Sequence, residues 1–321
     1  MKRCIGLVVL GLVMAFAAAC TDDTGDDVTL LQGFVPPSVE EGEVGLVTEI
    51  IKNIPAGADI NYCTYLPYTT DRTMDVVGAI GKQSLKGGHH ALLYIASNPQ
   101  APGTHECTEE DMLNARYVAA AGGGNANGSV IEIPDGIGFR VPEGVQLFVQ
   151  SHWVNASDEA IDGQIAFSLN VQEPTTEISP AQLLTVVDTE FTISAGAEGN
   201  TTTSCTFPED ISFFIMGGHA HEYGSHVRLR HKHGDTGVEE TIYETEWQYE
   251  YASDPPMNAF SKEEPYVVKA GDTISVDCSY LNTENHDIRF PQEMCVGFGY
   301  YFPAVYEINC ADGRWPDVGN E

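Results

Sequence analysis

Two histidines separated by a single residue, His219 and His221, follow an apolar run and two glycines. Side chains alternate between the two faces of an extended strand, so these imidazoles share a face and could close on one metal ion, whereas Ala220 points away. Neutral imidazole is the commonest metal ligand in proteins. An isolated pair of this kind also fits two solvated residues at the end of a strand.

A second group of histidines lies in the first half of the chain, where His89 and His90 follow two glycines at the start of an apolar run. Neighbours on a regular strand face opposite ways, so joint binding of one ion requires an irregular strand start, which the glycines permit. His152 shares a face with Gln150 in the alternating run 145–154, and this face is either a working face or a solvent face.

Met294 begins a further apolar run, directly before Cys295. Methionine usually fills a core, and only a soft metal such as Cu(I) uses its thioether as a ligand. A set of two histidines and a methionine therefore indicates copper rather than zinc. A zinc hydrolase that uses His219, His221 and an acid such as Glu222 is a weaker alternative.

Short β-type runs separated by Gly, Pro, Asn and Asp make up most of the chain, a spacing typical of β-sandwiches. The segment 172–180 lacks periodicity and is the predicted linker. We therefore predict an all-β protein with two consecutive antiparallel β-sandwich, jelly-roll-like domains. Residues 29–172 would carry the first metal site, and residues 181–313 the second.

One helix and one loop are also expected in the first half. The sequence from Thr108 to Asp111 resembles a capping box and predicts a short helix through about Tyr117. The glycine-rich segment 119–129 predicts a flexible loop.

The first twenty residues have the pattern of an export signal: two basic residues, an apolar stretch too short to span a membrane, and three alanines before Cys20. The Ala-Ala-Ala-Cys ending resembles a bacterial lipoprotein cleavage site, so Cys20 is the predicted lipid anchor and residues 21–28 an acidic tether. We expect an exported protein of the bacterial cell envelope, lipid-anchored at the outer membrane or periplasmic face. Ordinary secretion is the alternative.

The formal net charge is -32. With no basic patch to neutralise phosphates, the sequence disfavours nucleic acid as a partner, and the acidic side chains indicate a solvated surface. Six of the eight cysteines lie after Cys20. In an exported protein this even number favours three disulfides, although six cysteines allow fifteen pairings.

Together these motifs resemble the copper type II, ascorbate-dependent monooxygenases, the family of peptidylglycine α-hydroxylating monooxygenase and dopamine β-monooxygenase. The resemblance spans roughly Ile60 to Cys310. It includes the run 136–141, Gln150 before His152, and the sequence that leads from Met294 to two tyrosines.

The resemblance implies two copper ions per chain. The first, which takes electrons, would be held by His89, His90 and His152. The second, where O₂ binds and a C–H bond is hydroxylated, would be held by His219, His221 and Met294. The family also implies the disulfides Cys205–Cys310 and Cys278–Cys295, which leaves Cys63 to pair with Cys107.

Two positions depart from the peptide-amidating members of that family. An arginine two residues before the H-x-H pair and a tyrosine four residues after the methionine help to hold a peptide carboxylate there. This chain has Gly217 and Phe298 instead. A peptide ending in glycine is therefore an unlikely substrate, and an apolar or neutral molecule fits better.

The resulting hypothesis is a copper-dependent monooxygenase that hydroxylates a small organic substrate with O₂ and an external reductant such as ascorbate. The alternative is a copper-binding surface lipoprotein without turnover, a buffer or carrier. The remaining histidines are interpreted as surface or supporting residues, and His226 is expected near the second site: His105, His226, His231, His233 and His286.

Overall fold

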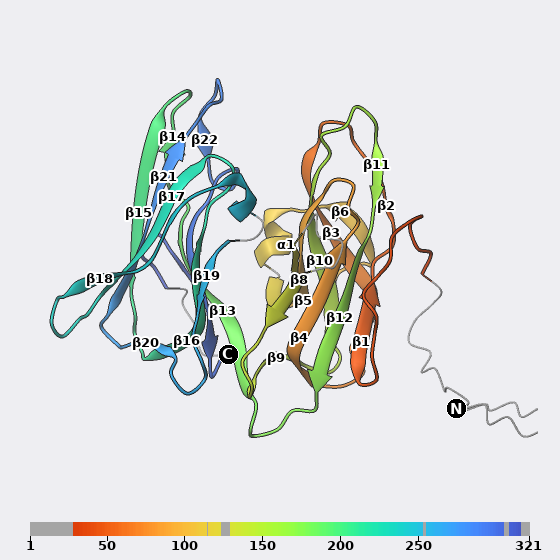
Figure 1. Ribbon diagram of the computed structural model, residues 1–321, viewed down its shortest axis with the longest axis horizontal. Coiled ribbons are helices and arrows are strands. Elements are labelled where there is room, and N and C mark those ends of the chain that lie inside the picture. The colour runs from red at the N-terminus through yellow and green to blue at the C-terminus, as the bar shows by residue number, and fades with distance from the viewer. Residues whose placement is uncertain (1–27, 114, 123–128, 253–254, 305–307, 316–321) are drawn as a thin grey trace, which may run out of the picture.

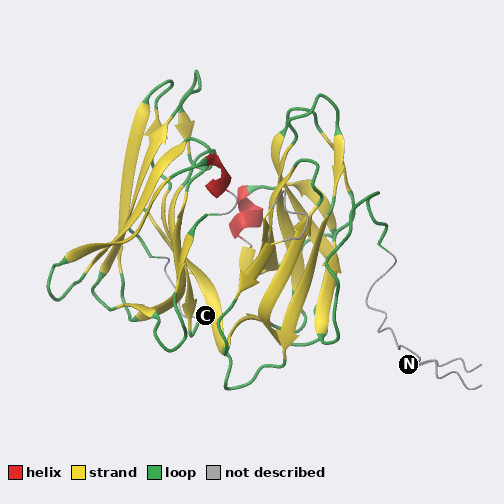
Figure 2. Ribbon diagram, viewed as in Figure 1, coloured by secondary structure: helices red, strands yellow, loops and turns green. Residues whose placement is uncertain are grey.

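The computed structural model describes residues 28–113, 115–122, 129–252, 255–304 and 308–315. The predicted export signal, Cys20 and nearly all of the predicted tether lie outside these residues. The described chain consists of strands with one short α-helix and one 3₁₀ turn, which confirms the all-β prediction (Figure 2). None of the helices in the described ranges has the length and apolarity needed to cross a bilayer.

The N-terminal half is built from two sheets packed face to face (Figure 1). Leu93, Val149 and Trp153 are among the fully buried side chains between them, because alternate residues of each strand point inward. One sheet has the order β1 (Glu43–Val47), β12 (Ile165–Gln172), β4 (Met74–Gln83), β9 (Ile137–Val141), with β8 (Ser129–Glu132) also on β4. The other has the order β6 (Gly103–Glu106), β3 (Asp59–Thr69), β10 (Gln146–Val154), β5 (Gly88–Ala96), β7 (Ala115–Gly122). A separate pair is β2 (Ile51–Ile54) with β11 (Ile161–Gly163).

The C-terminal half is a second sandwich around its own buried core. One sheet has the order β13 (Ser179–Asp188), β23 (Cys295–Phe302), β16 (Ile211–His219), β19 (Met257–Ala259), with β20 (Tyr266–Val268) on β16 and β24 (Ile308–Ala311) on β13. The other has the order β15 (Glu198–Thr206), β21 (Thr273–Leu281), β17 (Gly224–Lys232), β18 (Glu239–Glu246). A short pair joins β14 (Thr192–Ile193) to β22 (Ile288–Arg289).

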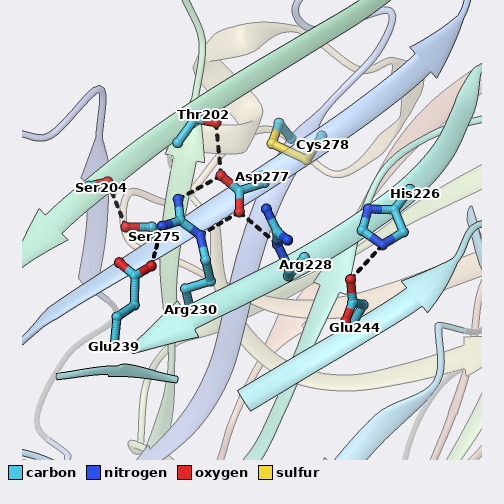
Figure 3. Close-up of polar contacts among 11 residues, drawn as sticks. Thr202, Ser204, His226, Arg228, Arg230, Glu239, Glu244, Ser275, Asp277 and Cys278 are labelled. Atoms are coloured by element: carbon cyan, nitrogen blue, oxygen red, sulfur yellow. Dashed lines mark hydrogen bonds and ion pairs between the residues drawn. A yellow bond between two sulfur atoms is a disulfide. The ribbon is translucent and has the colours of Figure 1, made fainter. Parts of the chain in front are cut away.

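Charged side chains interact across the outer face of the sheet β15-β21-β17-β18 (Figure 3). Asp277 on β21 accepts hydrogen bonds from Arg228 and Arg230 of β17, at 3.0 and 2.6 Å. His226 faces Glu244 across β17 and β18, with Nε2 and Oε1 3.0 Å apart. The core side of the same strands is apolar at Val227 and Leu229.

The two halves are joined through β13, which pairs in parallel with β9 and then antiparallel with β23. Ser179 and Pro180, predicted to belong to the linker, are therefore strand residues, because β9 offers them a hydrogen-bonding edge. One sheet of eleven strands runs through both halves. The predicted domain boundaries at 172 and 181 stay a prediction.

Aromatic packing fixes how the halves meet. The ring centroids of Tyr300 lie 5.0 Å from Tyr117 and 5.3 Å from Phe139, and Phe214 lies 5.9 Å from Tyr300. All four side chains are buried. Since Tyr300 and Phe214 come from β23 and β16, this face of the C-terminal sheet is directed at the N-terminal core.

Three disulfides form with the predicted partners. They are Cys63–Cys107 in the N-terminal half, and Cys205–Cys310 and Cys278–Cys295 in the C-terminal half.

The predicted helix begins as expected but ends early. Thr108 and Asp111 exchange capping hydrogen bonds, and α1 covers Glu109–Leu113. From Ala115 the chain forms β7 on the edge of β5, so residues 119–122, predicted to be loop, are strand. The pairing edge of β5 outweighs the local sequence signal. The segment 123–128 lies outside the described residues.

Candidate metal centres

Three histidines converge at one end of the N-terminal half. His89 and His90 begin β5, and His152 lies near the end of the neighbouring strand β10. Each offers a ring nitrogen, and these nitrogens lie within 4.8 Å of one another. All three side chains are half-buried. The structure therefore brings together the three residues predicted for the first site.

An irregularity in the strand pairing directs the adjacent histidines to one place. His152 pairs with His90, whereas Trp153 pairs with Gly88, so His89 is the extra residue of a β-bulge. Gly87 has φ +75°, and a Cβ on Gly88 would lie 2.5 Å from the Ser84 carbonyl oxygen. The two glycines thus permit the irregular strand start that the sequence analysis required.

The spacing of the ring nitrogens suits a small metal ion. The Nδ1 atoms of His89 and His90 are 3.2 Å apart. Two imidazoles bound at about 2.0 Å to a tetrahedral ion such as zinc have nitrogens about 3.3 Å apart. The pair therefore has the separation of two ligands on one first-row metal ion.

Asp59 fixes the third imidazole. Its carboxylate accepts a hydrogen bond from Nε2 of His152, and this bond is the largest cause that lowers the pKa of Asp59. The Nδ1 lone pair of His152 is then free for an ion. A carboxylate that holds the far nitrogen of a ligand histidine is a common support of metal sites.

Burial keeps these imidazoles neutral. Desolvation, with repulsion from His152, lowers the pKa of His89 to about 4, and the same causes hold the pKa of His90 well below 6.5. At neutral pH both rings therefore present lone pairs, which is the form that binds a metal.

The second pair of histidines lies at the end of β16 in the C-terminal half. His219 is the last residue of the strand, opposite Val296 of β23, and His221 follows two residues later. Their ring centroids are 5.0 Å apart. Burial lowers the pKa of His219 to about 3, and burial also lowers the pKa of His221. Both rings are thus neutral and lie side by side, as predicted.

Met294 is held beside His221 by a residue that the sequence analysis missed. The buried carboxylate of Glu293 accepts backbone N–H hydrogen bonds from His221 and Met294 through Oε1 and from Tyr223 through Oε2. Burial raises the pKa of Glu293 to about 7, although these three donors favour the ionised form. An acidic residue directly before an apolar strand was the available signal.

The register of β16 and β23 shows which residues share a face of the sheet with His219. Gly217 is opposite Phe298 and His219 is opposite Val296, and the pairing ends there, so His221 and Met294 lie just beyond the two strands. Residues two apart on a strand share a face. The face that carries Gly217 and His219 therefore also carries Phe298.

The tautomer of His221 is set by the backbone. Its Nδ1 lies 2.9 Å from the carbonyl oxygen of Gln292. A carbonyl oxygen only accepts, so Nδ1 carries the proton and Nε2 carries the lone pair. The indole of Trp247 donates to the His221 carbonyl oxygen at 3.0 Å, which further fixes this residue.

The two groups of histidines face each other. Tyr249 of the 3₁₀ turn η1 (Tyr249–Ala252) in the C-terminal half packs against His89, with ring centroids 5.8 Å apart and the rings tilted by 60°. Desolvation is the main cause that lowers the pKa of His89 and of His90, and the proximity of His221 adds to it. Tyr249 is a contact between the halves that no sequence motif marked.

The other histidines differ more in exposure than the sequence analysis predicted. His105 contacts Asp111, and His226 pairs with Glu244 on the surface, as expected for surface or supporting residues. His231 is not a surface residue, because only 1% of its side chain is exposed. It lies on the same face of β17 as the buried residues Val227 and Leu229.

Comparison with known proteins agrees with the copper assignment. Residues 171–318 match the family model described as copper type II ascorbate-dependent monooxygenase, C-terminal domain. No curated protein matches the chain.

Similarities to solved structures are weak. The chain resembles the Cowpea mosaic virus top component, an empty particle, at 8% identity and TM-score 0.38, covering 88% of this chain and 93% of that one. It resembles the major capsid protein of bacteriophage PM2 at 9% identity and TM-score 0.32, covering 81% and 97%. Scores at this level carry no argument about this protein.

The matched segment contains β16, β23 and the residues His219, His221 and Met294. Residues 171–318 of this chain therefore match the copper type II ascorbate-dependent monooxygenase C-terminal domain family, as the sequence resemblance predicts.

Proposed function

We propose that this protein is a copper-dependent monooxygenase that hydroxylates a C–H bond of a small organic substrate, with O₂ and an external reductant such as ascorbate. One observation carries the proposal. A three-histidine cluster with ligand atoms within 4.8 Å faces the His219–His221 strand end, and that strand lies in a segment of the copper monooxygenase family.

The chain's own residues would prepare both sites. Burial keeps the imidazoles of His89, His90 and His219 neutral. Asp59 directs Nδ1 of His152 towards the first site, and the Gln292 carbonyl directs Nε2 of His221 towards the second. Glu293 holds the backbone of Met294 next to that of His221. Copper, when bound, would supply electron transfer at the first site and O₂ activation at the second, where a thioether favours Cu(I).

The substrate class follows from the residues beside the second site. A Cβ on Gly217 would lie 3.0 Å from the Phe298 ring and 3.3 Å from the Met257 side chain. These apolar groups occupy the place where a cationic side chain would have to extend. We therefore propose a neutral, largely apolar substrate rather than a carboxylate-bearing peptide.

The second candidate is a copper-binding protein without turnover. The same apolar surroundings favour it, because no charged group at Gly217 or Phe298 anchors a substrate. The two candidates differ in oxygen consumption and share the copper sites.

Oxygen uptake by the copper-loaded full-length chain, measured with an electrode, tests the proposal. Ascorbate and neutral one-electron donors would each be combined with a panel of apolar C–H substrates. We expect donor-dependent uptake with a hydroxylated product, lost in His219→Ala and retained in His226→Ala, whose surface histidine pairs with Glu244. Copper binding without uptake for any donor and substrate would favour the carrier.

A further inference from the structure

A second cluster of metal-ligating side chains lies in the C-terminal half, away from the facing histidine sites. His231, His233 and Glu240 each offer one ligand atom, and these atoms lie within 4.8 Å of one another. His231 ends the core-facing row of β17 that begins with Val227 and Leu229. Glu240 of β18 pairs directly with His231, so both side chains occupy the same face of the sheet.

The cluster also includes groups from other elements. Asp272, in the turn before β21, has its Oδ2 2.9 Å from Nε2 of His231. The hydroxyl of Tyr266 on β20 lies 2.6 Å from Nδ1 of His231 and 3.3 Å from Oε1 of Glu240. Since β20 belongs to one sheet and β17 to the other, the cluster links the two sheets of the C-terminal sandwich.

Hydrogen bonding orients the buried histidine for a metal. Asp272 has its other oxygen on the Gly234 N–H at 2.8 Å, and its Oδ2 also accepts from the Lys269 N–H at 2.9 Å. A carboxylate fixed in this way accepts from Nε2–H of His231, which leaves the lone pair on Nδ1, where the Tyr266 hydroxyl lies 2.6 Å away and would yield its place to an ion. A carboxylate on the far nitrogen of a ligand histidine is the usual support in zinc sites.

The remaining ligands are accessible from solvent. The side chains of His233 and Glu240 are 34% and 54% exposed, and Nε2 of His233 is 3.2 Å from Oε1 of Glu240. His231 and Asp272 are 1% and 5% exposed. An ion could therefore enter from the His233 side and meet a preformed imidazole at the bottom.

We propose that His231, His233 and Glu240 form a third metal site, for a divalent ion of the Zn²⁺ class, with Asp272 as its supporting carboxylate. Two imidazoles and one carboxylate without sulfur suit a borderline divalent ion and do not suit Cu(I). The bound ion would tie the β17–β18 hairpin to Tyr266 and Asp272 at the edge of the sandwich. The alternative is a metal-free network of hydrogen bonds among the same residues.

The test uses Co²⁺ and Zn²⁺ with the full chain carrying His89→Ala and His219→Ala, so that both copper sites are impaired. We expect one equivalent of Co²⁺ with the strong visible absorption of low-coordinate cobalt, displaced by Zn²⁺. Adding His233→Ala should weaken binding at least about tenfold. Adding His226→Ala should leave it unchanged, because the His226–Glu244 pair lies on the same strands but on the opposite face.

Glu240→Gln provides a second, exposed variant if His233→Ala misfolds, and it should also bind Co²⁺ at least about tenfold more weakly. Zn²⁺ should raise the unfolding temperature of the parent and not that of Glu240→Gln. Absence of a bound equivalent in the parent, or equal Co²⁺ binding by the His233→Ala and His226→Ala variants, would overturn the proposal. Neither outcome depends on copper loading or on monooxygenase activity.

Discussion

Replacing Glu293 with glutamine should weaken the second copper site while leaving the first intact. The carboxylate of Glu293 is fully buried and accepts three backbone N–H groups, from His221, Tyr223 and Met294. Glutamine keeps the shape of the side chain but exchanges one accepting oxygen for an NH₂ group. In the better orientation the remaining oxygen serves His221 and Met294, and the Tyr223 N–H faces another donor.

The expected loss of stability follows from the one N–H group, that of Tyr223, which is left without an acceptor. One buried N–H without an acceptor costs about 1–3 kcal/mol, and hydrogen bonds to a charged acceptor are stronger than those to an amide oxygen. Removing a buried charge offsets part of this loss. We therefore expect a net destabilisation of about 2 kcal/mol, and a copper affinity at the second site that is about 10–100-fold lower, as for other supporting residues of metal sites.

Copper affinity is measured by competition for Cu(I) with a chromophoric chelator. The protein carries His89→Ala, so that binding at the second site is followed. Stability is measured by urea unfolding of the metal-free protein. Glu222→Gln is the matched control, because Glu222 is an exposed neighbour of His221. Its affinity and unfolding midpoint should equal those of the background protein. The reasoning is refuted if Glu293→Gln also matches the background in both measurements.

Three further predictions concern the two sites. Asp59→Asn should lower copper affinity at the first site about 10–100-fold, because the amide holds the His152 ring less well, and chelator competition should find the second site unchanged. The folded-state pKa values of His89 and His219, about 4 and about 3, lie below 6.5, so their contribution to metal-free stability is present above pH 6.5 and is lost as pH falls toward 4. Urea midpoints should therefore drop between pH 6.5 and 4, and a flat profile would contradict the burial of these rings. Replacing Cys278 and Cys295 with alanine opens a disulfide of sequence separation 17 and should cost about 3 kcal/mol. It should also reduce second-site copper, since Cys295 follows Met294, whereas an unchanged unfolding curve would be the contrary result.

The closeness of the histidines within each pair could be predicted from the sequence, because the two members of a pair are neighbours or nearly so in the chain. Alternation along a strand is enough to place His219 and His221 together, and two glycines are enough to suggest the bulge at His89. The disulfide pairs and the C-terminal family assignment came instead from the resemblance to known monooxygenases.

Residues that act through tertiary contacts escaped the sequence analysis. Glu293 and Asp59 support ligands that are distant in the chain or on another strand, and their spacing carries no motif. Tyr249 contacts His89 only because the halves meet as they do. His231 was interpreted as a surface or supporting residue, but the β17 register places it on the core face.

Secondary structure failed where strand pairing overrode local preference. Ser179 and Pro180 were predicted to be part of the linker, but they belong to β13 and pair with the edge of β9. Residues 119–122 read as loop, yet they add β7 to β5. The export signal and the lipid anchor at Cys20 stay predictions, as does the location of the protein in the cell envelope.

Copper counting on purified wild-type protein, beside His89→Ala and Met294→Ala, tests the central claim most directly. Two independent copper sites, one at each group of histidines, predict about two equivalents in the wild type and the loss of about one in each variant. Measuring the variants with a chelator selective for Cu(I) should assign the loss in Met294→Ala to the second site. The same copper content in all three proteins would contradict the account.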